Sequence, residues 1–247
     1  AKACVAVFAG GKFYLVDVGP ESVENLVLWG IPLSAVGGAL LTHFHSDHIG
    51  DLGELNLQTW AGGRPAPLAV YGGPGIDKVV EGFNDAYRLD QGYRTKHHGD
   101  KVMSPTTWPM IPHTVDLDGE PTPAKDRTGL VLDNGSLRIT AIEVDHAPIA
   151  PAYAYRFDYK GRSVVVTGDL KFHKPLAKGA KNPAIETAEF APVAYDACLA
   201  CHADWRVDVH GRDQDGAACY ACHAKAESPS KIAAALKTAD LPATGSK

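Results

Sequence analysis

The chain has 247 residues, 45% of them hydrophobic, and a formal net charge of −5 at pH 7. These values are typical of one globular α/β domain with a large core. No apolar run reaches the ~20 residues of a membrane-spanning helix, and no Lys/Arg cluster stands out, so we expect neither a membrane span nor a nucleic-acid partner. Since the first residue is Ala1 and not Met, we expect a missing leading segment, with a signal peptide as one candidate.

The first 60 residues predict a hairpin and two helices. Residues 3–8 and 12–17 are apolar runs separated by the glycine pair at 10–11, which is a hairpin turn signal. Residues 21–29 have apolar side chains at helical spacing, and residues 52–60 predict a second helix. This order already indicates a mixed α/β architecture.

The segment between these helices is unusually rich in metal-binding side chains. It holds three imidazoles and one carboxylate within six positions, namely His43, His45, Asp47 and His48. It follows the apolar residues 38–41, which predict a short buried strand. Loops at strand ends are where rigid scaffolds carry functional side chains. Nitrogen and carboxylate donors at this density suit Zn²⁺ or a similar transition metal.

The middle of the chain is harder to interpret. Residues 68–71 predict a strand that runs through a glycine-rich turn into a helix over residues 76–87. Residues 88–128 show no clear periodicity and contain five prolines, so we expect an irregular lid there. The adjacent His97 and His98 are interpreted either as a solvated pair or as substrate contacts.

Several segments together resemble one known family. The His-x-His-x-Asp-His pattern at residues 43–48 resembles the metal motif of the metallo-β-lactamase superfamily. The segment around His146 is similar to the one that carries the family's third histidine, and the strand over 163–169 to the one that ends in its bridging aspartate. The spacing is most similar to the arylsulfatase and ribonuclease Z-like branch, over roughly residues 1–182. The resemblance implies an αββα sandwich, two mixed sheets with helices outside.

The resemblance also implies a dinuclear zinc centre with six ligands. These are His43, His45 and His146 at the first ion, Asp47 and His48 at the second, and Asp169 as the bridge. Two such ions, about 3.5–4 Å apart, would hold a hydroxide that attacks an ester. Asp47 would also orient that nucleophile as a base. The expected substrate is a small-molecule sulfate, phosphodiester or lactone.

After Asp169 the chain departs from the family pattern. The family closes its second metal site with a histidine some 50–60 residues further on. His210 is the remaining candidate, either for that role or as a distal haem ligand. Without it, the second site would be open or completed by water.

The tail carries a second kind of motif. It contains two Cys-x-x-Cys-His units, formed by Cys198, Cys201, His202 and by Cys219, Cys222, His223. Each unit is the attachment signature of a c-type haem, so residues 183–228 predict two haems. The same cysteines also have the spacing of a zinc ribbon, and free or disulfide-linked thiols are a third possibility. Residues 229–247 form a polar tail.

Two functional classes follow. The first is a metal-dependent ester hydrolase with a haem-bearing tail. The second is a c-type cytochrome-like electron-transfer protein with a redox partner, in which the hydrolase fold is a degraded scaffold. Covalent haem attachment takes place outside the cytoplasm, so we expect an exported, periplasmic protein.

Overall fold

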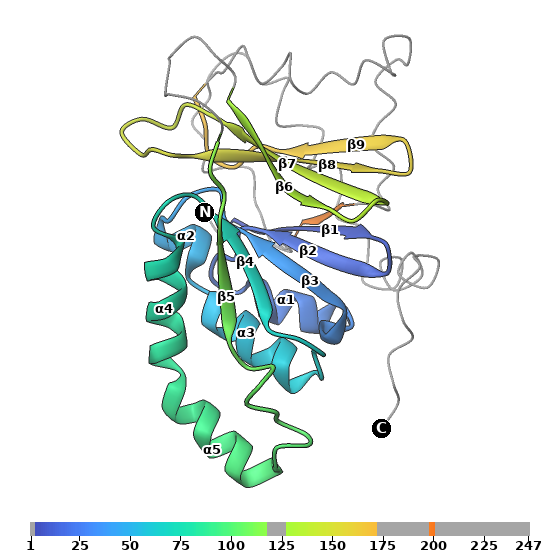
Figure 1. Cartoon of the computed structure of the whole chain (residues 1–247), viewed down its shortest axis with the longest axis vertical. Helices are drawn as coiled ribbons and strands as arrows, with labels where there is room; N and C mark the ends of the chain where they lie inside the picture. Colours follow the sequence, from blue (N-terminus) through green and yellow to red (C-terminus); the bar gives the residue numbers. More distant parts are fainter. Residues whose placement is uncertain (1–2, 118–126, 172–197, 201–247) are drawn as a thin grey trace.

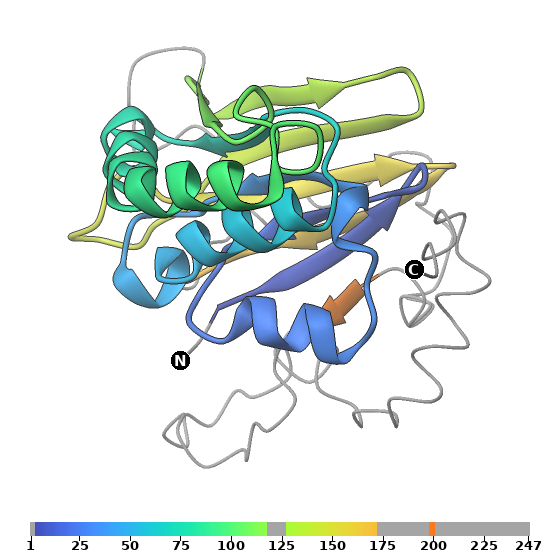
Figure 2. The ribbon, with the colours of Figure 1, turned by 90° about the horizontal axis from the view of Figure 1, so that it is seen from below.

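The computed structural model describes residues 3–117 and 127–171 and the backbone of residues 198–200. Two β-sheets lie face to face, and the helices of the described residues lie on the outer side of the first sheet (Figures 1 and 2). The predicted α/β sandwich is therefore confirmed for its first three layers, but the second sheet, expected to be mixed, is antiparallel over its described strands. A helix layer outside the second sheet would lie beyond the described residues.

The first sheet has six strands in the order β10-β1-β2-β3-β4-β5, and the second has four in the order β6-β7-β8-β9. The strands of the first are β1 (Val5–Ala9), β2 (Lys12–Val16), β3 (Val36–Leu40), β4 (Leu68–Gly72), β5 (Met110–Thr114) and β10 (Cys198–Ala200). Those of the second are β6 (Thr128–Asp133), β7 (Leu137–Glu143), β8 (Tyr153–Tyr159) and β9 (Arg162–Val166). The helices are α1 (Ser22–Leu28), α2 (Ser46–Ile49), α3 (Leu52–Ala61), α4 (Ile76–Ala86) and α5 (Arg88–His98), with a 3-10 turn over Leu33–Ala35.

Two apolar layers hold these elements together. Between the helices and the first sheet, the apolar faces of α1, α3 and α4 pack against inward side chains such as Phe13, Leu15 and Val70. Between the two sheets, residues including Tyr155 and Phe157 of β8 meet the opposite face of the first sheet. The strands β2, β3 and β4 are therefore covered on both sides, and their parallel pairing fits that burial, whereas the edge strand β5 is largely exposed.

This topology gathers several strand ends at one edge. The parallel strands β2, β3 and β4 all end at the same edge of the first sheet. The start of β8 reaches that edge, because the Tyr153 amide donates to the Thr42 carbonyl over 2.9 Å. The loops after β7 and β9 lie beside the start of β8, since both strands pair with it in antiparallel fashion. Segments more than a hundred residues apart in the sequence thus meet there.

Residues 88–128, predicted to be irregular, contain α5 and the edge strand β5. The sequence did not reveal α5 because none of its residues is buried, so it has no periodic apolar face. In Figure 1, α5 continues from α4 away from α2 and the sheet edge described above. The remainder of the expected lid, residues 118–126, lies outside the described residues. No helix in the described ranges is long and apolar enough to cross a membrane.

Asp51 gives the fold a pH dependence. It stands at the start of α3, but its carboxylate accepts the Val23 amide of α1 over 2.9 Å instead of capping its own helix. Burial and the nearby carboxylates of Glu24 and Glu54 raise the pKa of Asp51 to about 6. The folded pKa exceeds the usual value of 3.8, so the charged carboxylate destabilises the fold, and stability is lost as the pH rises from about 4 through about 6.

We therefore expect Asp51→Asn to raise the melting temperature by a few °C at pH 8. The amide oxygen still accepts the Val23 amide, while the unfavourable charge is gone. At pH 4 the carboxyl of the wild-type protein is already protonated, and the difference should vanish. Thermal unfolding followed by circular dichroism at both pH values measures this. An equal gain in melting temperature at both pH values would contradict this prediction.

Candidate metal centre

The loop after β3 is fixed by a buried carboxylate at the end of β2. Asp17, only 2% exposed, has a left-handed backbone with φ of 61°. Its Oδ1 accepts the Thr42 amide over 2.8 Å, and its Oδ2 accepts the Thr42 hydroxyl over 2.9 Å. The same Oδ2 lies 2.8 Å from Nδ1 of His48. One side chain therefore positions both ends of the loop and fixes which nitrogen of His48 points outward.

Close backbone contacts reinforce this loop. The Val18 amide donates to the His48 carbonyl over 2.7 Å, and the Ala3 amide to the Asp47 carbonyl over 3.1 Å. Gly168 has φ of 59°, and a Cβ there would lie 2.8 Å from the side chain of Thr42. The strand that leads to Asp169 can therefore approach the loop only because residue 168 is a glycine.

The first donor group consists of three imidazoles. Nε2 of His43 lies 2.8 Å from Nδ1 of His45, and the ring of His146 lies edge-on to that of His43 with centroids 4.7 Å apart. One nitrogen from each ring lies within 4.8 Å of the others. Nε2 of His146 is buried and has no hydrogen-bond partner among the described residues. A buried polar nitrogen without a partner costs free energy, and a bound metal ion would satisfy it.

The second donor group adjoins the first and shares His43. It consists of His43, His48 and Asp169, again with ligand atoms within 4.8 Å. Nε2 of His48 is 3.5 Å from a carboxylate oxygen of Asp169 and 3.9 Å from one of Asp47. The two carboxylates are 54% and 41% exposed, whereas His48 is 1% exposed. The imidazole therefore forms the floor of the centre, and the carboxylates face solvent, where a substrate would enter.

The charges suit a cation. Burial and the neighbouring imidazoles lower the pKa of His43 to about 4, so its nitrogen is free to bind a metal at neutral pH. The hydrogen bond from His48 lowers the pKa of Asp169 to about 2, which keeps it anionic. Burial alone would lower the pKa of His48, but its bonds to Asp169 and Asp17 raise it to about 10. Metal binding at His48 must therefore displace a proton.

All six predicted ligands come together in this centre: His43, His45, Asp47, His48, His146 and Asp169. Every group of three or more metal-donating side chains in the described part of the chain lies here. The sequence did not single out the support from β8, where the Tyr155 hydroxyl donates to the Leu41 carbonyl over 2.8 Å. No local signal marks that contact, because 114 residues separate its partners.

Other candidates lie elsewhere. His97 and His98 are in the last turn of α5 and belong to neither donor group. The strand β10 includes the backbone of Cys198 and pairs with β1. The other predicted tail ligands lie outside the described residues, namely Cys201, His202, His210, Cys219, Cys222 and His223.

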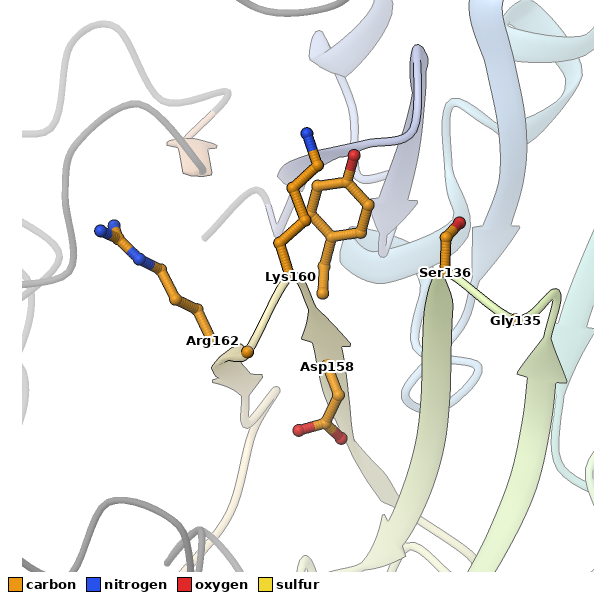
Figure 3. A pocket seen from close by; sticks show the side chains of 7 residues that line it. Gly135, Ser136, Asp158, Lys160 and Arg162 are labelled. Carbon is orange, nitrogen blue, oxygen red and sulfur yellow. The ribbon is translucent and has the colours of Figure 1, made fainter.

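An open cleft of about 550 Å³ lies between the hairpin ends of the second sheet, lined by Ser136, Asp158, Lys160 and Arg162 among others (Figure 3). It lies at the β6–β7 and β8–β9 turns, and His146 and Asp169 follow the opposite ends of β7 and β9. Its one carboxylate, Asp158, already pairs with Arg156 over 2.7 Å. We therefore do not assign the chemistry to this cleft.

The fold and its two adjoining donor groups define an α/β sandwich with a candidate metal centre at one edge of its sheets. A family model described as the metallo-beta-lactamase superfamily matches residues 2–199, and the chain belongs to that superfamily. It is 38% identical over 166 residues to a ribonuclease Z of Mycobacterium avium (strain 104), covering 66% of this chain and 54% of the relative. A ribonuclease Z of Mycobacterium marinum (strain ATCC BAA-535 / M) is 34% identical with the same coverage. The chain thus spans about half the length of these curated relatives.

A solved structure agrees on the fold. The short form of human tRNase Z matches with a TM-score of 0.52, covering 68% of this chain and 62% of the other. Its sequence identity of 16% supports the shared architecture alone.

The expectation of a small-molecule ester and no nucleic-acid partner is contradicted, because the relatives are named as ribonucleases. That expectation rested on the absence of a basic cluster and on the net charge of −5. A net charge averages over the whole chain. It does not count the positive charge that bound metal ions would contribute at the centre.

Replacing His45 by Ala should remove most of the bound metal. His45 supplies a nitrogen to the three-imidazole group, and two imidazoles hold a metal far more weakly than three. Metal content of the purified protein, measured by mass spectrometry, tests this. His98→Ala, a change at an exposed histidine outside the centre, is the matched control. Unchanged metal content in His45→Ala would contradict the assignment.

Replacing Asp17 by Asn should weaken metal binding at the second donor group by about 10- to 100-fold. The amide keeps the shape but loses the negative charge that orients His48. The first donor group, which is linked to Asp17 only through the Thr42 hydroxyl beside His43, should lose less affinity. Competition with a chelating dye resolves the two affinities. Equal weakening of both would argue for a general loss of structure instead.

Proposed function

We propose that this protein hydrolyses phosphodiester bonds in RNA with a dinuclear zinc centre. The observation that carries the proposal is the pair of donor groups that share His43 and open to solvent through Asp47 and Asp169. The names of the relatives support RNA as the substrate class and favour a phosphodiester over a sulfate or a lactone.

The residues of the centre have separate roles in the proposed reaction. His43, His45 and His146 would hold one ion, and Asp47, His48 and Asp169 would hold the other. When bound, two such ions lower the pKa of water to about 7 and neutralise charge on the phosphate. Asp47, 41% exposed at the mouth of the centre, is placed to orient the attacking water and to accept its proton. The buried Asp17–His48 pair keeps the floor rigid while the reaction proceeds.

The metal-loaded protein should therefore hydrolyse bis(p-nitrophenyl) phosphate, a small chromogenic phosphodiester. Release of p-nitrophenol should stop on chelation and return when Zn²⁺ is added. The matched sulfate ester and an aryl lactone serve as comparison substrates and should react much more slowly. Asp47→Asn should lower kcat by about 10²–10⁴-fold through loss of the base. Faster turnover of the sulfate than of the phosphodiester would overturn the proposal.

Stepwise chelation should remove the second ion first. Its carboxylate ligands are half-exposed, and the described residues offer it no further histidine. The first ion is held by three imidazoles, of which His43 is buried. Metal content should fall from two equivalents through one to none as chelator is added. A single step from two to none would contradict unequal sites.

We further propose that the tail bears haem, on the basis of the pair of Cys-x-x-Cys-His units in the sequence. An exported, periplasmic location and a redox partner belong to the same proposal. An absorption spectrum with a Soret band near ~410 nm would support haem. Four titratable thiols without such a band would overturn it. The convergence of the metal donors favours the hydrolase over the reading in which this domain is a degraded scaffold.

A further inference from the structure

Helices α4 and α5 form an arm: α4 starts near the metal-binding loop and packs against the first sheet, and α5 continues from it past the end of that sheet (Figure 1). The arm begins beside the metal-binding loop, because a Cβ at Gly75 would lie 3.5 Å from the ring of Phe44. Each helix has 11 residues. At ~1.5 Å per helical residue, the tip of α5 lies on the order of 30 Å from that loop.

The arm is held firmly by the body. The side chain of Asn84 in α4 bonds both the amide and the carbonyl of Met110 in β5, each over 3.1 Å. The Thr95 hydroxyl of α5 donates to the Met103 carbonyl over 2.9 Å. Below the helix junction, Tyr87 packs against a buried cluster that includes Trp108. These contacts fix α5 at a distance from the centre.

One face of α5 combines apolar and cationic side chains. Leu89 and Tyr93 are 70% and 67% exposed, and Lys96 and His97 are also exposed. Their positions, separated by four, three and one residues, place them along one side of the helix. Exposing large apolar side chains is unfavourable, and a contiguous group of them on a fixed helix marks a binding surface.

The charge changes sign along the arm. Helix α4 carries three carboxylates and one lysine, whereas α5 carries three cations and one carboxylate besides its two histidines. The acidic residue Asp90 is engaged by Arg94 over 2.6 Å. Arg88 pairs with Asp85 of α4, so the net positive charge of α5 lies at Lys96 in the last turn, beside two histidines. This excess stands out in a chain with a net charge of −5.

We propose that the α5 face formed by Leu89, Tyr93, Lys96 and His97 binds RNA. This inference rests on the proposed function, because it concerns the same RNA whose phosphodiester is cleaved at the metal centre. Tyr93 offers a flat ring on which an unpaired base stacks, and Lys96 contacts the adjoining phosphates. An extended polymer spans the arm, whereas a small ester does not.

A second copy of the chain fits this face less well. In a symmetric dimer the same patch would meet itself, which places the two cationic tips against each other. A polyanion instead neutralises the charge and covers the apolar side chains. The surface therefore favours nucleic acid over self-association.

The test uses the full-length, metal-loaded protein and a fluorescent RNA hairpin with a single-stranded 3′ extension, 2′-O-methylated to prevent cleavage. Binding is measured by fluorescence anisotropy over a range of salt concentrations. Tyr93→Ala and Lys96→Glu should each raise the Kd about tenfold. Lys96→Glu should also reduce the salt slope by about 1. Lys12→Glu makes the same charge change at the exposed start of β2, away from the arm, and should leave the Kd unchanged within about twofold.

Circular dichroism confirms that each variant is folded. Wild-type affinity in both α5 variants, or no binding by the wild-type protein, would overturn the inference. A concentration-dependent dimer that Leu89→Glu abolishes in sedimentation would assign the face to a second copy and overturn it as well. Binding that depends on α5, without hydrolysis of the small phosphodiester, would keep this inference and sink the proposed function. Hydrolysis of the small phosphodiester without RNA binding would keep the proposed function and overturn this inference.

Discussion

The buried carboxylate of Asp17 is the interaction on which the metal centre depends. It accepts two hydrogen bonds from Thr42 and contacts Nδ1 of His48, so it joins the end of β2 to both ends of the loop. A carboxylate this deeply buried is costly unless hydrogen bonds compensate it. One of these compensating hydrogen bonds, the one with Nδ1 of His48, also orients the His48 ring. Stability and function are therefore coupled in one side chain.

The sandwich provides the second constraint. Parallel strands of the first sheet end at one edge, and the antiparallel hairpins of the second sheet return to the same edge. His43 can face His146 only because the two sheets pack with that edge in common. The packing of the two sheets thus holds the donors in place, with Nε2 of His146 buried among them. Such preorganisation reduces what the protein must rearrange when it binds charge.

Charged side chains are unevenly distributed over this protein. The chain as a whole is acidic, yet α5 is cationic and the imidazole cluster is built for cations. A phosphate backbone responds to local fields within about a Debye length of ~10 Å, so the total charge says little about where it binds. The arm and the centre are two such local regions, separated by a helix of opposite sign.

The sequence by itself determined the elements with a strong local pattern. Turn glycines at 10–11 and the apolar runs on either side fixed the first hairpin, and the dense motif at 43–48 fixed the metal loop, because both depend on neighbouring residues. It missed α5, which buries nothing and so leaves no periodic signal. Only the tertiary structure decided that His146 and Asp169 meet that loop, and that α5 stands apart from it. Those outcomes depend on how the sheets pack, a property of residues distant in the chain.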